Sequence, residues 1–128
     1  MRDLKHLIYF ESLLQEANNA LITQAKNEGK ICAAFVCENT PEPLLTLDGV
    51  FSVRLSAPHT GSMDIATYYM TSFLCEHSRA LLERAIEGGY NFADCLITTV
   101  GCAMMNRCGE DMGLMHTMDG GDRKFFYE

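Results

Sequence analysis

The sequence has 128 residues, of which 48% are hydrophobic and 21% charged, so we expect a single globular domain over residues 1–128 with a sizeable core. Ten basic and seventeen acidic residues give a net charge of -7, and no stretch gathers Lys and Arg into a phosphate-binding patch, which argues against nucleic acid as a partner. The N-terminal stretch contains no uninterrupted apolar run of signal-peptide or membrane-span length, so we expect a cytoplasmic protein that binds no membrane.

The cysteines form no CxxC pair, so the usual zinc-finger and ferredoxin spacings are absent. Without an export signal, reduced thiols that are buried or metal-bound are favoured over a disulfide framework. We expect the two cysteines inside apolar runs, Cys32 and Cys95, to lie in the core. The full set is Cys32, Cys37, Cys75, Cys95, Cys102 and Cys108.

The first half of the chain predicts one long helix, a strand, a short helix and a second strand. Apolar residues at helical spacing extend over residues 3–28, and Gly29 ends this helix. Residues 30–37 form a short apolar run of strand length. Thr40, as an N-cap followed by Pro, begins the short helix, and residues 50–55 are the second strand.

The second half predicts a helical region, an amphipathic helix, a third strand, a further helix and a last strand, at residues 63–74, 71–89, 91–100, 102–112 and 123–128. In the amphipathic helix, Glu83, Arg84 and Glu87 fill the face opposite the apolar stripe. Strands that alternate with helices predict a Rossmann-like, three-layer α/β fold: a parallel sheet of three or four strands with helices on both faces.

Candidate functional residues follow the predicted strands. Ligands of open α/β sheets bind beyond the carboxyl ends of the strands. Cys37, His59 and Cys102 come after the first, second and third strand, and Cys75 stands at the start of the amphipathic helix, where N–H groups and the helix dipole favour a thiolate. These side chains suit a metal site, with His59 as a candidate for catalytic proton transfer. Each can instead be structural: a buried thiol, or a solvated loop histidine.

Several segments together resemble one known family. They are "FVCENTPEP", the Thr-Gly-Ser loop, the Ser-Phe-x-Cys segment that ends at Cys75, and "EGGYNFADCLITTVGC", which ends at Cys102. From about residue 30 to residue 128 the sequence looks like the N-terminal domain of 2-hydroxyacyl-CoA dehydratases and the related class I benzoyl-CoA reductases.

The resemblance implies a 4Fe-4S cluster held by three cysteines, with one iron open to substrate or water. Cys75 and Cys102 correspond to the first two ligands, whereas the third family cysteine lies in a C-terminal domain that is not within these residues. Cys108 is one and a half turns past Cys102 and should point away from it. The implied reaction is radical elimination of water from a hydroxyacyl-CoA to an enoyl-CoA. The implied partners are a related dehydratase subunit, an ATP-dependent activator that supplies the electron, and the acyl-CoA substrate.

The sequence also departs from the family pattern. Glu76 follows Cys75 where the family commonly has Pro, and Ala103 follows Cys102 where it commonly has Asp. The chain is therefore interpreted as a divergent or truncated member that is catalytically silent in isolation and forms a homo-oligomer. The alternative is a metal-free α/β binding or interaction domain without catalytic activity of its own.

Overall fold

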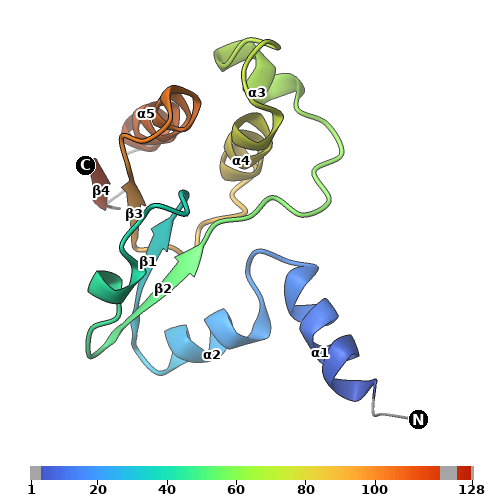
Figure 1. Cartoon of the computed structure of the whole chain (residues 1–128), viewed down its shortest axis with the longest axis vertical. Coiled ribbons are helices and arrows are strands. Elements are labelled where there is room, and N and C mark those ends of the chain that lie inside the picture. Colours follow the sequence, from blue (N-terminus) through green and yellow to red (C-terminus); the bar gives the residue numbers. More distant parts are fainter. Residues whose placement is uncertain (1–3, 119–123, 128) are drawn as a thin grey trace.

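The computed structural model describes residues 4–118 and 124–127. Their four strands form one fully parallel sheet in the order β2-β1-β3-β4 (Figure 1). The parallel α/β architecture predicted from the sequence is confirmed. The elements are α1 (Lys5–Leu14), α2 (Ala20–Asn27), β1 (Ile31–Phe35), the 3-10 helix η1 (Glu42–Leu45), β2 (Val50–Arg54), α3 (Asp64–Tyr69), α4 (Glu76–Ile86), β3 (Cys95–Thr98), α5 (Ala103–Met118) and β4 (Lys124–Tyr127).

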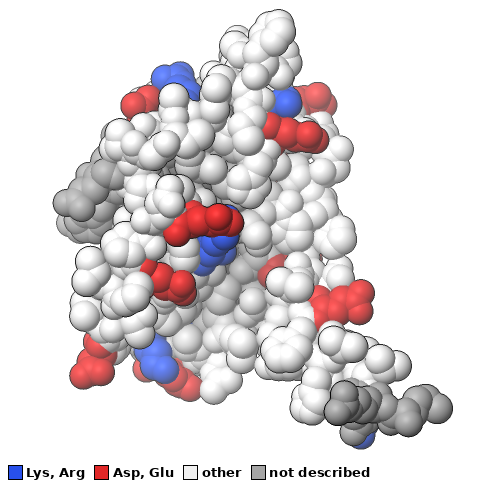
Figure 2. Space-filling view, viewed as in Figure 1, with Lys and Arg blue, Asp and Glu red and all other residues white. Residues whose placement is uncertain are grey.

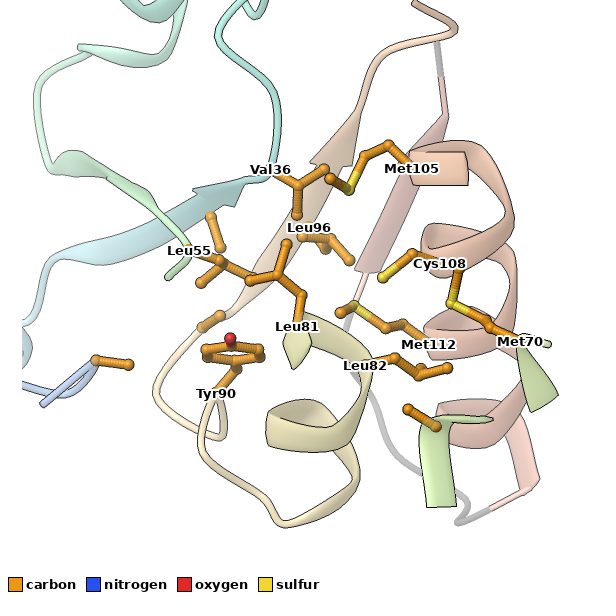
Figure 3. Packing of buried hydrophobic residues seen from close by; sticks show 14 of the residues in the cluster. Val36, Leu55, Met70, Leu81, Leu82, Tyr90, Leu96, Met105, Cys108 and Met112 are labelled. Atoms are coloured by element: carbon orange, nitrogen blue, oxygen red, sulfur yellow. The ribbon is translucent and has the colours of Figure 1, made fainter. Parts of the chain in front are cut away.

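The main core lies between one face of the sheet and helices α3, α4 and α5 (Figure 3). Alternate residues of β1 and the residue after it, Cys32, Ala34 and Val36, belong to this core, as expected from the period of two along a strand. Ala33 and Phe35 between them are buried as well, so β1 is covered on both faces. Helices α4 and α5, together with Met70 directly after α3, contribute the remaining large side chains: Met70, Leu81, Leu82, Met105, Cys108 and Met112.

The N-terminal region is two helices and not the single helix predicted over residues 3–28. The Asn19 side chain accepts hydrogen bonds from the backbone N–H groups of Leu21 and Ile22, and so caps a new helix, α2, in the middle of the predicted one. A short polar side chain that serves the backbone in this way competes with a continuous helix. Helix α1 has no buried residue, and it exposes apolar side chains such as Leu14, which is 75% exposed.

Two other predicted helices are shorter or tighter than expected. The helix expected from Thr40 is only the 3-10 turn η1, and Thr40 makes no side-chain cap, since its buried hydroxyl has no hydrogen-bond partner among the described residues. The helix expected over residues 63–74 ends at Tyr69, because Met70 adopts an extended backbone conformation that directs its side chain into the core.

The sequence suggested that Glu83 lies on the solvent-facing side of α4, but in the structure it is buried. Its Oε2 accepts a hydrogen bond of 2.6 Å from the backbone N–H of Ala66, in the first turn of α3. The N–H groups in the first turn of a helix have no acceptor within that helix, so Glu83 supplies the partner that the buried Ala66 N–H needs. One carboxylate of α4 therefore fixes the position of α3.

Asp94, just before β3, joins three elements. Its Oδ2 accepts hydrogen bonds from the buried backbone N–H of Cys32 at 2.7 Å and from the Lys26 ammonium at 2.6 Å. Partial burial acts to raise the pKa of Asp94, but the Cys32 N–H and Lys26 outweigh it, and the pKa is lowered. The carboxylate thus ties α2 to β1 in its charged form.

We predict that Asp94→Ala lowers the free energy of unfolding by about 1–2 kcal/mol at pH 7, because the buried Cys32 N–H loses its acceptor. A carboxyl group whose pKa is depressed in the folded state stabilises above its unfolded pKa of about 3.9 and loses that contribution as pH falls through the folded value. In urea unfolding, the difference in free energy of unfolding between the wild-type and Asp94→Ala proteins should therefore become smaller below about pH 4. Asp94→Asn, which keeps an acceptor for Cys32, is the control and should lose less; an equal loss would contradict this account.

Candidate metal centre

Cys75 and Cys102 occupy equivalent positions at the starts of two helices. Cys75 is the N-cap residue of α4, and its carbonyl accepts from the N–H of Arg79 at 3.1 Å. Cys102 directly precedes α5, and its carbonyl accepts from the N–H of Asn106 at 2.9 Å. Both thiols are free and exposed. Each cysteine therefore lies at the N-terminal end of a helix, beside the first backbone N–H groups of that helix.

The two helices lie side by side and run in the same direction. The Cys108 thiol of α5 donates to the Ser78 carbonyl of α4 at 3.3 Å, and one turn further on Leu82 and Met112 lie together in the core (Figure 3). Cys75 lies three residues before Ser78, and Cys102 six before Cys108. At about 1.5 Å of rise per residue, the two helix starts are offset by roughly 4.5 Å along axes that are about 8–10 Å apart. Both cysteines thus belong to the same end of the helix pair.

Other cysteines are held as neutral thiols inside the protein. Burial raises the pKa of Cys32 and of Cys108 to about 12. As predicted, Cys32 is fully buried; Cys95 is only half-buried, and burial is again the main cause of its raised pKa. The buried Cys108 thiol donates a hydrogen bond to the Ser78 carbonyl. A thiolate is the metal ligand, so these residues have a structural role.

Cys37 lies at the same edge of the sheet, after β1, and is half-buried. Its pKa is lowered, first by a hydrogen bond from the Thr99 side chain and then by one from the backbone of Asn39. Thr99 Oγ1 is buried and has no other hydrogen-bond partner among the described residues, so it is available to a Cys37 thiolate. A Cβ added at Gly101 would lie 3.5 Å from Asn39 Nδ2, so the loops after β1 and β3 are in close contact. The sequence did not reveal this pairing, because Cys37 and Thr99 are far apart along the chain.

His59 lies on the loop after β2, with an exposed side chain and a backbone φ of 57°. Its Nε2 is 2.9 Å from Oε1 of Gln15, in the linker between α1 and α2. The hydrogen bond that the structure gives it is thus with the N-terminal region and not with either cysteine. Arg54, at the end of β2, is exposed and paired with Glu38 at 3.1 Å.

An exposed apolar surface, which we call the aromatic surface, adjoins Cys75. It comprises Ile65, Tyr68 and Tyr69 of α3 and Phe73 of the turn before Cys75. Phe73 is 95% exposed and Tyr68 88% exposed. Figure 2 shows that the projecting tip of the molecule over α3 carries no charged side chain on the viewed face. The adjacent pair Tyr68-Tyr69, followed by Phe73, was the signal in the sequence that could have identified this surface.

The donor chemistry at the helix starts fits an iron-sulfur cluster, because two exposed thiols are its preferred kind of ligand. The number of donors does not fit a complete site. Within residues 4–118 and 124–127, no group of three or more His, Cys, Asp or Glu side chains is arranged to hold a metal ion. Among these residues, Cys75 and Cys102 thus do not make a complete metal site by themselves. In the same described ranges, no helix has the length and apolar character needed to cross a bilayer.

Comparison with known proteins gives one family. A family model described as 2-hydroxyglutaryl-CoA dehydratase, D-component, matches residues 37–122. This range begins just after β1 and contains the aromatic surface and both exposed cysteines. A search of curated proteins returns no match.

We predict that alkylation sorts the cysteines by burial. With iodoacetamide at pH 8, peptide mass mapping should find Cys75 and Cys102 modified first, and Cys32 and Cys108 unmodified until the protein is unfolded, because their protonated thiols are poor nucleophiles. Cys37 should remain reactive at lower pH than an ordinary thiol, since its lowered pKa leaves more thiolate there. Rapid modification of Cys108 together with Cys75 would contradict the packing of α4 against α5.

Proposed function

Since the chain belongs to the 2-hydroxyglutaryl-CoA dehydratase D-component family, we propose that it is the iron-sulfur-binding part of a 2-hydroxyacyl-CoA dehydratase-like subunit. Family membership implies a complex with other dehydratase subunits. The finer proposal concerns the cofactor and the reaction: a 4Fe-4S cluster, and elimination of water from a hydroxyacyl-CoA to give an enoyl-CoA. An ATP-dependent activator would be the source of the electron.

The observation that carries the proposal is the position of the two exposed thiols. Cys75 and Cys102 begin adjacent helices that run in the same direction, at the edge where the strands of a parallel sheet have their carboxyl ends. The exposure of both side chains leaves their sulfurs accessible to a ligand. This combination supports metal binding better than it supports a packing role.

In the proposed site, Cys75 and Cys102 would hold the cluster through their sulfur atoms, and any further ligand would come from outside the described residues. A bound cluster supplies one-electron chemistry and Lewis acidity to this class of reaction. His59 is proposed for proton transfer, since an imidazole can both accept and donate a proton. Its hydrogen bond to Gln15 would have to be exchanged for one to substrate.

A second candidate function is a metal-free domain that binds a partner or a CoA-like ligand. The incomplete donor set among the described residues favours it. The two candidates differ in one optical property, since only the first gives a protein with iron-sulfur absorption.

We predict that anaerobic reconstitution of the 128-residue chain with iron and sulfide gives a brown chromophore, and that Cys75→Ala or Cys102→Ala abolishes it. The protein as purified in air should be largely colourless and without dehydratase activity, because a cluster with few protein ligands is labile. Cys95→Ala is the matched control: its thiol lies at the first residue of β3, away from the helix starts, so the chromophore should be retained. If the wild-type chain binds no iron, the metal-free candidate is the better one.

A further inference from the structure

Helix α3 is apolar on two opposite faces. Ala66 and, directly after the helix, Met70 lie in the core. Ile65, Tyr68 and Tyr69 have the spacing i, i+3 and i+4, so they share one face of α3, and this face is exposed. A helix that is apolar all round normally lies inside a protein. The exposed face of α3 therefore has the composition of a buried surface.

Phe73, in the turn between α3 and α4, completes the aromatic surface with the three side chains of α3. An aromatic side chain buries about 150–250 Å² when it is covered, so the four residues together offer roughly 500 Å². An exposed apolar patch of this size is at the upper end for a monomer and often marks an interaction site. With a polar rim added, it approaches the area of about 800 Å² that each partner buries in a standard interface.

Contacts with α4 hold the aromatic surface in place. Glu83 Oε2 accepts a hydrogen bond from the Ala66 N–H at 2.6 Å, and the Arg79 guanidinium donates to Thr67 Oγ1 at 3.0 Å. The two tyrosine rings of α3 pack edge to face, with centroids 5.8 Å apart. A surface that is already ordered loses less conformational entropy when it binds a partner.

Charged side chains of both signs border the aromatic surface. Asp64 begins α3, Glu76 begins α4, and Arg79 follows about one turn later in α4. Within residues 4–118 and 124–127, none of these three side chains forms an ion pair with another side chain. A rim that carries unpaired charges of both signs around an apolar centre is complementary to itself, as an isologous contact requires.

We propose that two copies of this chain associate through the aromatic surface about a two-fold axis, with Arg79 of each copy facing Glu76 of the partner subunit. Every contact in such an interface occurs twice, so the apolar centres cover one another and both Arg-Glu pairs form together. The aromatic side chains are the anchors, because large aromatic residues contribute most to binding when they are desolvated. The association requires no metal and is therefore separate from the proposed iron-sulfur function.

The first test is sedimentation velocity of the iron-free, 128-residue chain under reducing conditions. The reductant prevents disulfide links between exposed cysteines of different copies. Between about 1 and 100 µM, where contacts of micromolar affinity become populated, the monomer should convert to a dimer. A chain that stays monomeric throughout would overturn the inference and leave the iron-sulfur proposal standing, since reconstitution tests that proposal independently.

The second test locates the interface by substitution. Phe73→Ser and Tyr68→Ser should each weaken dimerisation about tenfold or more. Phe10→Ser, on the exposed apolar helix α1, is the matched control and should leave dimerisation unchanged. Because Phe73 and Tyr68 are 95% and 88% exposed, their replacement should not alter thermal unfolding of the dilute chain. Loss of the dimer in Phe10→Ser, with the dimer intact in Phe73→Ser, would place the interface on α1 and overturn the inference.

The third test exchanges the charges of the rim. Glu76→Arg and Arg79→Glu should each weaken the dimer about tenfold, because like charges then face each other across the axis. An equimolar mixture of the two variants should recover dimers, since every facing pair is again of opposite sign. Circular dichroism and thermal unfolding establish that each variant is folded. Two folded variants that remain monomeric when mixed would overturn the proposed pairing.

Discussion

The parallel pairing of all four strands is the constraint on which the rest of the structure depends. Antiparallel neighbours can be joined by a tight turn, but a chain that re-enters a sheet in the same direction must first return along its length, usually through a helix. Helix α5 makes such a return between β3 and β4, and α4 packs beside it in the same direction. Both helices consequently begin at the carboxyl edge of the sheet. The positions of Cys75 and Cys102 therefore follow from the parallel topology of the sheet and do not depend on an unusual local sequence.

Burial distinguishes cysteines that are chemically identical. Cys32 and Cys108 lie inside the core, where desolvation disfavours a negative sulfur and raises the pKa of each thiol to about 12. Cys75 and Cys102 reach solvent at helix starts, where the backbone offers partial positive charge. Cys37 is intermediate in burial, but the Thr99 hydroxyl lowers its pKa. A buried thiol and a solvent-exposed thiol can thus lie a few residues apart in the chain, as Cys108 and Cys102 do.

Local sequence patterns correctly predicted the structural features that depend on residues close together along the chain. Short apolar runs indicated the parallel strands, and amphipathic spacing placed the start of α4 at Cys75, as observed. They were wrong where a single side chain had two possible partners: Asn19 bonds the backbone and ends one helix to begin another, and Glu83 turns inward to α3. The side-by-side packing of α4 and α5, which places the two thiols at one end, depends on contacts between distant segments such as Cys108 with Ser78. Cys108 and Ser78 are too far apart along the chain for a local sequence pattern to include both.

Helix α1 has a consequence for how the protein opens. It has ten residues, no side-chain cap and no buried residue. Gln15, directly after α1, forms a hydrogen bond with His59. A helix of this length is marginal in water without tertiary support. Amide hydrogens of α1 should thus exchange with solvent through local fraying, whereas those of β1 exchange only when the whole core opens. The chain therefore consists of a cooperative unit built on the sheet and an N-terminal segment whose folding is nearly independent of it.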